Sequence, residues 1–258
     1  NKEIMIRKIR AKKRTLLVDG DILCYRIATA IEEATEWQDD MWTLHADAKL
    51  GKELLENTLN RYLKELNCNN IVVALSDKTN FRKKLFPEYK SHRKKVRKPI
   101  IVKPLKEYIY KQYPTYRLPD LEGDDTLGIL ATSKYKDNCI ILSSDKDMRT
   151  IPCFHHFIHD NQTELVDEKT ADYYFMFQTL TGDSSDGYSG IKGCGAIKAE
   201  RVLYNSEKTL PSMWKAVVEE YKRNNLTEKD ALLQARMARI LRSSDYNFKN
   251  KKPILWKL

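Results

Sequence analysis

The chain of 258 residues is 41% hydrophobic with nine Gly and eight Pro, which excludes a disordered or fibrous protein and fits one large α/β core with a smaller appendage. Its net charge of +10 indicates a polyanionic partner wherever the positive residues cluster. No apolar run is long enough for a secretion signal or a membrane span, and the five cysteines form no CxxC pair, so we expect a cytoplasmic protein with reduced thiols and no membrane partner.

Strand and helix patterns alternate through the first 150 residues. Three short apolar runs without polar alternation predict strands buried on both faces, at 16–18, 71–75 and 139–142. Helical patterns lie between them at 22–36, 47–66 and 124–135. In the second of these helices one stripe is predicted to carry Leu50, Leu54, Leu59 and Leu63. The alternation predicts a doubly wound α/β fold with a parallel-dominated sheet flanked by helices.

Positive charge is concentrated in two segments. Residues 78–111 carry thirteen Lys and Arg against two Glu, and residues 1–14 carry seven against one. Four tyrosines, at 89, 108, 110 and 113, interleave the first segment, an arrangement that can stack the bases of a single strand. Packing of a following helix explains Tyr108 or Tyr110 equally well. A solvated basic loop without a partner is the alternative interpretation.

Acidic residues follow each predicted strand. Two follow the first, one the second and two the third: Asp19, Asp21, Asp77, Asp145 and Asp147. In an open parallel sheet these strand ends line one crevice. Further acids that can reach this crevice come from a helix start and a Gly-rich turn: Glu122, Asp124, Asp125, Asp183 and Asp186.

This set of carboxylates predicts a metal site. Any one of the acids alone is explained as a helix-start or turn residue, but together they repel unless cations neutralise them. Oxygen-only ligands favour Mg²⁺ or Mn²⁺. Two such ions about 4 Å apart can activate a water and stabilise the leaving oxygen of an in-line phosphodiester displacement.

Residues 16–21 also match a competing motif, the strand-DxD start of haloacid-dehalogenase-type phosphatases, with Asp183 and Asp186 imitating their late acidic motif. That fold would use Asp19 as a covalent nucleophile. It explains neither Asp77, nor the acids at 122–125, nor a basic segment far larger than a small phosphate ester requires.

The C-terminal third changes character. A polar, Gly-rich stretch at 182–195 is followed by helical patterns near 196–204, 213–224 and 228–242, which predict a small helical domain. The last residues lack a clear period and are expected to pack back on the sheet. The His-rich run 153–159 lacks the second cluster that a zinc site needs and predicts a strand instead.

At this point the residues resemble a known family, the 5′-nucleases that include flap endonucleases and the nuclease domain of bacterial DNA polymerase I. The motifs are Val18-Asp19-Gly20 with Arg26, then Asp77, and the stretches FRKKLFPEYKSHRK (81–94), LEGDD (121–125), SSDKD (143–147) and GDSSDGYSGIKGCG (182–195). Their order and spacing agree over nearly the whole chain after residue 15. The likeness is strongest to the short 5′→3′ exonucleases of lytic bacteriophages.

The resemblance implies a PIN-like 5′-nuclease fold: a catalytic domain at 1–180 with a basic arch at 78–113, a helix-hairpin-helix domain at 181–243, and a tail at 244–258 packed on the catalytic domain. It implies that Asp19, Asp77, Glu122 and Asp124 surround one metal, with Asp125 beside it. Four further acids would surround the second metal: Asp145, Asp147, Asp183 and Asp186. Asp21 lies outside this pattern because most of the superfamily has no acid there.

The resemblance also places two cations, Arg26 and Lys90, at the scissile phosphate, where positive charge can offset charge developing on oxygen. The loop 190–195 before a helix has the form of a helix-hairpin-helix element, whose backbone N–H groups meet DNA phosphate. In the family it often holds a monovalent cation such as K⁺. The residues expected to contact DNA are Arg82, Tyr89, Arg93, Lys94, Gly190, Lys192, Gly193, Gly195 and Lys198.

The expected function is Mg²⁺-dependent 5′→3′ exodeoxyribonuclease action, with Mn²⁺ as a substitute metal, leaving 5′-phosphate products. The implied setting is phage DNA replication, recombination and primer removal in the host cytoplasm. The implied substrates are double-stranded DNA with 5′ ends, nicks or flaps and, as a further class, RNA–DNA hybrid, acted on by a monomer. A structure-specific flap endonuclease is the alternative within nucleases, and a non-catalytic DNA-binding protein is the alternative outside them.

Overall fold

A six-stranded sheet forms the centre of the computed structural model, which describes residues 12–39 and 41–258. Its strands are β1 (Arg14–Asp19), β4 (Cys68–Ala74), β5 (Thr115–Tyr116), β6 (Cys139–Ser143), β7 (Phe154–Phe157) and β8 (Gln162–Leu165). The α-helices are α2 (Gly20–Ile31), α3 (Ala48–Glu65), α4 (Phe81–Leu85), α5 (Val102–Gln112), α6 (Gly123–Ala131), α7 (Glu168–Thr181), α8 (Ala196–Tyr204), α9 (Leu210–Arg223) and α10 (Glu228–Ala238). Short 3-10 helices are η1 (Ser91–Lys95), η2 (Lys146–Thr150) and η3 (Ser243–Asp245).

The strand order is β5-β4-β1-β6-β7-β8, and every neighbouring pair is parallel except β7 with β8. In register, Asp19 at the end of β1 lies opposite Ala74 of β4, and Val18 lies opposite Leu142 of β6. The carboxyl ends of the three central strands therefore meet at one edge, as their acidic endings predicted. The parallel-dominated α/β class is confirmed.

Helices cover both faces of the sheet. Leu16 and Val18 point into a core shared with α2, α3 and α5, whereas Leu17 points to the opposite core, shared with α6. The predicted stripe on α3 is partly wrong: Leu59 is buried, but Leu50 and Leu54 are exposed. The five-residue step between Leu54 and Leu59 is longer than one helical turn, so the two pairs lie on different stripes.

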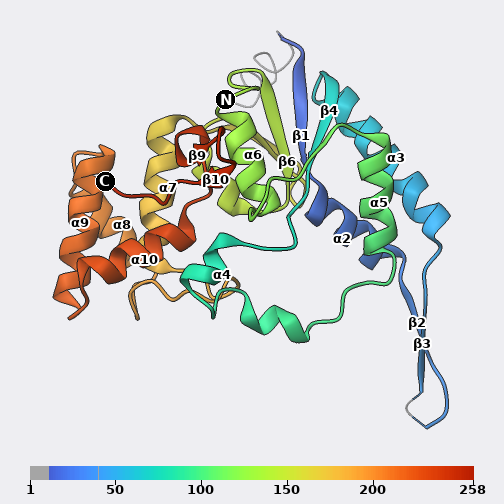
Figure 1. The fold of residues 1–258 in the computed structure, drawn as a ribbon, viewed down its shortest axis with the longest axis horizontal. Coiled ribbons are helices and arrows are strands. Elements are labelled where there is room, and N and C mark those ends of the chain that lie inside the picture. The colour runs from blue at the N-terminus through green and yellow to red at the C-terminus, as the bar shows by residue number, and fades with distance from the viewer. Residues whose placement is uncertain (1–11, 40) are drawn as a thin grey trace.

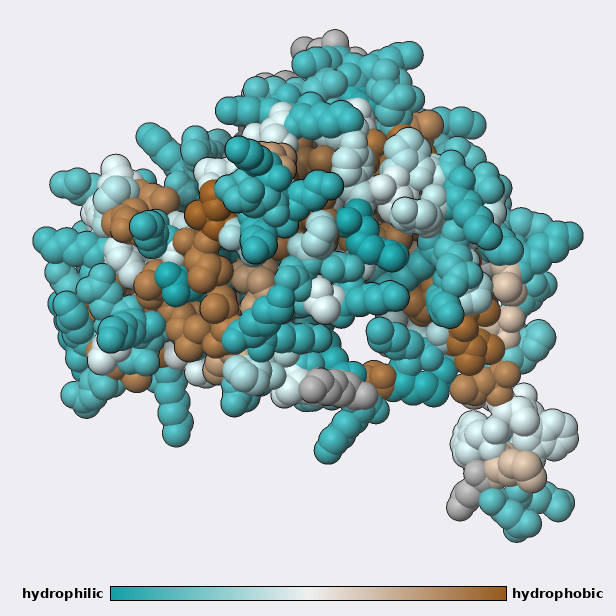
Figure 2. Space-filling view, viewed as in Figure 1, coloured by the Kyte–Doolittle hydropathy of each residue, from teal (hydrophilic) through white to brown (hydrophobic). Residues whose placement is uncertain are grey.

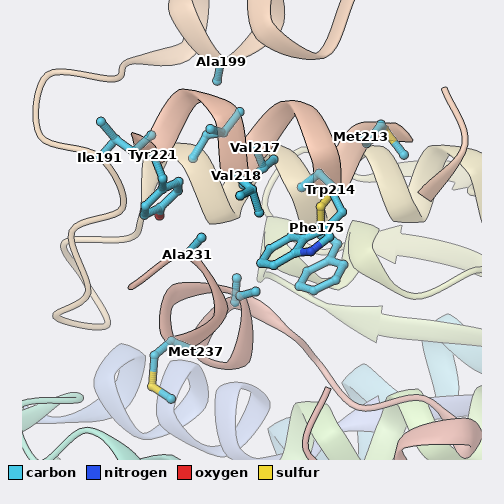
Figure 3. Packing of buried hydrophobic residues seen from close by; sticks show 14 of the residues in the cluster. Phe175, Ile191, Ala199, Met213, Trp214, Val217, Val218, Tyr221, Ala231 and Met237 are labelled. Carbon is cyan, nitrogen blue, oxygen red and sulfur yellow. The ribbon is translucent and has the colours of Figure 1, made fainter. Parts of the chain in front are cut away.

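The C-terminal helices form a second core. The side chains of α7, α8, α9 and α10 pack around Met213, Trp214 and Tyr221, as Figure 3 shows. Phe175 of α7 belongs to this cluster, so α7 packs with the helical part although the predicted boundary at 180 places it in the catalytic domain. The tail contacts both parts of the molecule: Trp256 packs on Trp214 of the helical part, at a ring separation of 4.9 Å, whereas Tyr246 packs beside α6.

Two segments project from this frame (Figure 1). Helix α2 ends at Ile31 rather than at residue 36, because the chain turns into a two-stranded ribbon of β2 (Glu33–Glu36) and β3 (Trp42–His45). All eight of these strand residues are exposed. The second segment is the middle of the basic arch (residues 78–113), around η1; the arch runs from α4 to α5, and α5 itself packs in the core against the sheet. Figure 2 shows an opening through the molecule between this segment and the body.

The five cysteines are free, and four of them are buried. The rings of His155 and His156 bond to a backbone carbonyl, a hydroxyl and an amide oxygen of nearby residues, and the pKa of His155 is lowered to about 4 by burial. The strand predicted in this run is confirmed as β7 over Phe154–Phe157, although three consecutive residues of it are buried and its burial does not alternate. No described helix is both long and apolar enough to cross a membrane.

Candidate active site

Asp19 lies where β1 passes into α2. Its Oδ1 accepts the backbone N–H of Ile22 at 3.1 Å, which caps α2, and its Oδ2 accepts the hydroxyl of Ser143 from the end of β6 at 2.9 Å. The side chain is buried, and burial followed by the charge of Asp21 raises the pKa of Asp19 to about 7. Two neighbouring strands therefore fix this carboxylate at the sheet edge.

The start of α6 supplies the next acids. Ligand atoms of Glu122, Asp124 and Asp125 lie within 4.8 Å of one another. Burial, followed by the charge of Glu122, raises the pKa of Asp124 well above its usual range. Burial also opposes ionisation of Glu122, but neighbouring cations, first Lys90 and then Arg82, outweigh it and lower its pKa to about 2. Lys90 and Arg82 therefore favour the ionised form of Glu122, whereas burial favours the protonated form of Asp124 two residues away.

Asp125 differs from its neighbours because both of its oxygens bind Arg82, each at 2.7 Å. Arg82 is itself buried and donates to the carbonyls of Met237 and Arg239. The prediction that Arg82 contacts DNA is wrong, because this guanidinium joins α4 to α6 and α10 inside the protein. Asp125 shapes the site by holding Arg82.

A second acidic group follows β6 and the Gly-rich turn. Asp145 caps η2 by accepting the N–H of Asp147 at 2.9 Å. Burial, then Asp145, raises the pKa of Asp147 to about 7, and the carboxyls of Asp147 and Asp183 interact directly. Burial acts to raise the pKa of Asp183, but hydrogen bonds from Ser185 outweigh burial, so the pKa is lowered.

Lys90 joins the two acidic groups. Its Nζ lies 2.7 Å from Glu122 Oε1 and 3.3 Å from Asp186 Oδ2. Its backbone adopts a left-handed conformation, with φ +53°, and its N–H bonds the carbonyl of Asp186 at 2.7 Å. Arg93 binds the other oxygen of Asp186 at 2.7 Å. Lys90, a cation predicted at the site, therefore lies at the base of the arch, between the two acidic groups.

Tyr89 occupies the space beneath Lys90. Its hydroxyl donates toward Glu122 at 2.8 Å and lies 2.9 Å from Asp186, and its ring is buried. Burial raises the pKa of Tyr89 well above its usual range. The prediction that Tyr89 stacks on DNA bases is wrong, because the ring has no exposed face to offer.

The turn that carries Asp183 and Asp186 depends on glycine. Gly182 and Gly190 cross so closely that a Cβ on either would lie 2.4 Å from the backbone nitrogen of the other, and both have positive φ. The N–H of Gly190 bonds Gln234 at 2.8 Å. The predicted DNA contact by Gly190 is therefore wrong: this residue closes the turn and its N–H is engaged inside the protein.

The rest of the glycine loop faces outward. Gly193, with φ +76°, and Gly195 are exposed, and a Cβ on either would meet nothing within 4 Å. Helix α8 begins at this loop without a side-chain cap, and Lys192 is exposed beside it. Lys198 is less available, because its Nζ lies 2.8 Å from Glu220 of α9.

Three other residues have predicted roles that the structure does not test. Asp77 reaches the sheet edge, but its Oδ2 accepts the N–H of Asp120 at 2.9 Å, a bond that lowers its pKa. Arg26 is exposed on α2. The side chain of Lys94 lies outside the part of the chain that the structure describes. The metal and DNA roles of these three residues stay predictions.

The chemistry of the donors fits divalent cations. Within the described residues, no ion pair is made by Asp19, Asp124, Asp145, Asp147 or Asp183, although Asp19 is buried, the others are at least partly buried, and all but Asp183 have raised pKa values. Asp145, Asp147 and Asp183 line a cleft of about 1000 Å³ together with Asp186, Lys90, Arg93 and Lys192. Asp19 and the acids at the start of α6 do not line this cleft, but Lys90 binds Glu122 and the charge of Asp145 acts on Asp19. Such a set of oxygens without enough protein cations is suited to hard metal ions.

Sequence reasoning missed Ser143, which bonds Asp19, and Gln178, which bonds Asp147. Ser143 had a detectable signal, since it stands between the third strand and its acids. Gln178 lies inside the α7 pattern, and its proximity to the site follows only from the packing of α7 along η2.

Known proteins resemble this chain both in sequence and in fold. A family model described as 5′-3′ exonuclease, N-terminal resolvase-like domain, matches residues 14–175. The exonuclease of Escherichia phage T7 is 32% identical over 95% of this chain and 94% of its own length. The exodeoxyribonuclease of Enterobacteria phage T3 is 30% identical, over 95% and 93%.

Solved structures share the fold. A flap endonuclease of bacteriophage T5, in a pseudo-enzyme-product complex with DNA and metal ions, has a TM-score of 0.67 at 15% identity, covering 88% of this chain and 89% of its own. The catalytic core of Rad2 in complex with DNA substrate has a TM-score of 0.53 at 15% identity, covering 84% and 67%.

Proposed function

The chain belongs to the 5′-3′ exonuclease family, and on that premise we propose that it is a Mg²⁺-dependent 5′→3′ exodeoxyribonuclease that hydrolyses DNA phosphodiesters to 5′-phosphate products. The observation that carries the proposal is the convergence of Asp145, Asp147 and Asp183, which make no ion pair among the described residues, on one cleft beside Lys90 and Arg93, with Lys90 also binding Glu122.

The acids divide into two sets of ligands. Asp19, Glu122 and Asp124, with Asp77, would hold one ion. Asp145, Asp147, Asp183 and Asp186 would hold the other. Two bound Mg²⁺ ions, or Mn²⁺ in their place, would supply activation of a water and stabilisation of the leaving oxygen.

The remaining groups act on the phosphate and on the ligands. Lys90 and Arg93 would turn from Asp186 toward the non-bridging phosphate oxygens, where their charge stabilises the transition state. Tyr89 and Asp125 orient Glu122 and Arg82 from beneath. Arg26 would contribute a further cation from α2.

The glycine loop would bind the DNA as it enters this cleft. The uncapped N-terminus of α8, with Gly193, Gly195 and Lys192 exposed around it, suits a backbone phosphate. K⁺ would be held by carbonyl oxygens of the loop, beside that phosphate. We propose duplexes with 5′ ends, nicks or flaps as substrates, with RNA–DNA hybrid as a further class. All the proposed ligands come from one chain, so a monomer suffices. The proposed setting is phage DNA replication and primer removal in the host cytoplasm.

One experiment tests the exonuclease proposal. Duplex labelled at either the 5′ or the 3′ end is incubated with protein and Mg²⁺, with and without EDTA. Early release of acid-soluble label from the 5′ end only, abolished by EDTA, supports the proposal. Release from the 3′ end first, or release unaffected by EDTA, contradicts it.

Flap endonuclease action is the second candidate, favoured by the opening beneath the basic arch (Figure 2), which could admit a free 5′ strand. Cleavage products of end-labelled flap and nicked duplex, sized on a gel, distinguish the two. Mononucleotides indicate exonuclease action, and a released intact flap indicates endonuclease action.

A further inference from the structure

A second groove lies between α7 and α8, away from the carboxylates. It encloses about 610 Å³, and its walls carry Lys169 and Tyr173 from α7, Arg201 and Tyr204 from α8, and Lys208 from the following loop. The buried ends of Leu203 and Met213 form its floor. Neither the metal ligands nor the glycine loop takes part in it.

The groove has the charge of a polyanion site. Lys169, Arg201 and Lys208 are exposed, and within the described residues none of them makes an ion pair. Glu200 is the single acid on its walls. Three cations against one acid give the hollow an excess of positive charge, which attracts phosphate.

The same groove offers aromatic and apolar faces to solvent. Tyr204 is 77% exposed and Ile197 is 76% exposed, on the outward face of α8, while Tyr173 is half-buried on α7. Exposed rings interleaved with cations form a stacking platform for unpaired bases. Bases inside a duplex are already stacked on each other, so these rings favour single-stranded nucleotides.

The groove continues the catalytic cleft. Tyr174 lines both hollows, and the guanidinium of Arg149, another residue of the cleft, lies 5.8 Å from its ring. Helix α8 connects the glycine loop at its first turn to Tyr204 at its last. Its nine residues span about 13 Å, which corresponds to roughly four nucleotides at the 3.4 Å spacing of a strand.

We propose that this groove binds the unpaired complementary strand that 5′→3′ digestion exposes beside the duplex. Bases stack on Tyr204 and Tyr173, and phosphates contact Lys169, Arg201 and Lys208. The choice of strand rests on the proposed function, because removal of nucleotides from a 5′ end leaves the complementary 3′-ended strand single. A partly digested duplex would then bind more tightly than an undigested one.

The test measures binding without cleavage. Fluorescence anisotropy in EDTA compares a blunt duplex, the same duplex with a short oligo-dT 3′ tail, and the same duplex with a 5′ tail. We expect the wild type to bind the 3′-tailed duplex about tenfold more tightly than the blunt one, the gain expected from stacking on about one ring. Tyr204→Ala should remove this gain and leave blunt-duplex affinity unchanged.

Matched variants keep the result interpretable. Tyr204→Phe retains a ring and should retain the gain, as should Lys229→Ala on α10, a cation outside the groove. Lys208→Ala should reduce the gain and its salt dependence. Equal wild-type affinity for tailed and blunt duplex would overturn the proposal, as would equal loss on both substrates, which would make the groove a duplex site.

A gain that Tyr204→Ala leaves intact would also overturn the proposal, since the tail would then bind elsewhere. Release of nucleotides from blunt duplex in Mg²⁺ is followed separately. A chain without nuclease activity that still shows the Tyr204-dependent gain would disprove the proposed function and leave this site standing.

Discussion

Lys106 of α5 makes an ion pair with Asp21 of α2, with Nζ 2.5 Å from Oδ1. The other oxygen of Asp21 accepts the N–H of Ser76 at 2.7 Å. Asp21 therefore ties the far end of the basic arch to the segment that follows β4. This explains an acid that the sequence placed beside Asp19 without a role among the metal ligands.

Asp21→Asn should retain metal-dependent cleavage within about tenfold, because the amide can still accept from Ser76 and no metal position is emptied. Loss of the partly exposed ion pair should cost about 1 kcal/mol of stability. Turnover and the melting temperature check both expectations, with Lys106→Met as the matched variant. Inactivity as severe as that of an Asp145 variant would place Asp21 among the ligands.

Asp145→Asn and Asp147→Asn should each abolish cleavage while duplex binding survives. Either change removes a charged ligand from the second metal set but leaves the glycine loop and the arch intact. Turnover should fall by orders of magnitude, measured at saturating DNA, with anisotropy on the same duplex as the binding control. Wild-type turnover by either variant would remove that residue from the metal site.

Metal binding should strengthen as pH rises from 6 to 8. Burial raises the pKa values of Asp19 and Asp147 to about 7, so both must lose a proton before they bind a cation. Titration calorimetry with Mg²⁺ in buffers of different ionisation enthalpy should detect proton release. Affinity independent of pH in this window would contradict the shifted pKa values.

The same two groups predict the pH dependence of stability without metal. Their folded pKa values lie above the unfolded ones, so their stabilising effect is complete at low pH and is lost as pH rises through about 7. Glu122, with a pKa of about 2, contributes equally at pH 6 and pH 8. His155, whose pKa burial lowers to about 4, acts in the opposite direction over this window, so the comparison between variants is the test: from pH 6 to pH 8 in EDTA, the melting temperature of the wild type should change more unfavourably than that of Asp147→Asn. Equal changes in the two proteins would contradict the assignment.

The sheet and most of the acidic cluster were predictable from sequence because their signals are local. An apolar run followed by an acid marks the carboxyl end of a buried strand, and parallel pairing then brings Asp19 and Asp145 together without further information. The glycine-rich stretch was recognisable as a turn, but the role of Gly190 was not, because its close crossing with Gly182 follows only from the structure.

Burial within the basic segment was not predictable. Arg82 and Tyr89 stand among lysines that are exposed, and nothing local separates them. Their burial depends on contacts with residues far along the chain: Arg82 with Met237, and Tyr89 with Asp186. Strand β2 was missed because residues 33–36 continue the helical pattern of α2, and only its pairing with β3, as of Glu33 with His45, distinguishes it.

Lys192 and Lys198 should differ in their contribution to duplex binding, although both flank the glycine loop. Lys192 is exposed, whereas Lys198 is held by Glu220. Lys192→Glu should weaken binding to all sequences and lower the slope of log affinity against log salt by about one unit. Lys198→Glu should have a smaller effect on the slope. An unchanged slope in Lys192→Glu would place the loop away from DNA.

The final prediction concerns the exposed part of the basic arch, residues 91–100. Only Ser91–Lys95 forms a 3-10 helix there, and the segment is anchored at its ends, by Lys90 at the carboxylates and by Arg97, which pairs with Glu32. Like charges in succession repel, and the residue before Pro99 is biased away from helical geometry. We therefore expect a short, mobile arch that guides 5′ strand ends by electrostatic attraction.

Neutralising Arg93, Lys94, Lys95, Arg97 and Lys98 should cost affinity for 5′ single strands and nicked ends much more than for blunt duplex, because the arch spans the opening and the glycine loop holds the duplex. Anisotropy on the three substrates measures this. Glu32→Gln is the matched variant: it releases the anchor at Arg97 without removing positive charge, so it should speed amide hydrogen exchange at 91–100 and spare affinity. Equal losses on all substrates, or slow exchange through 91–100 in the free wild type, would contradict a mobile guiding arch.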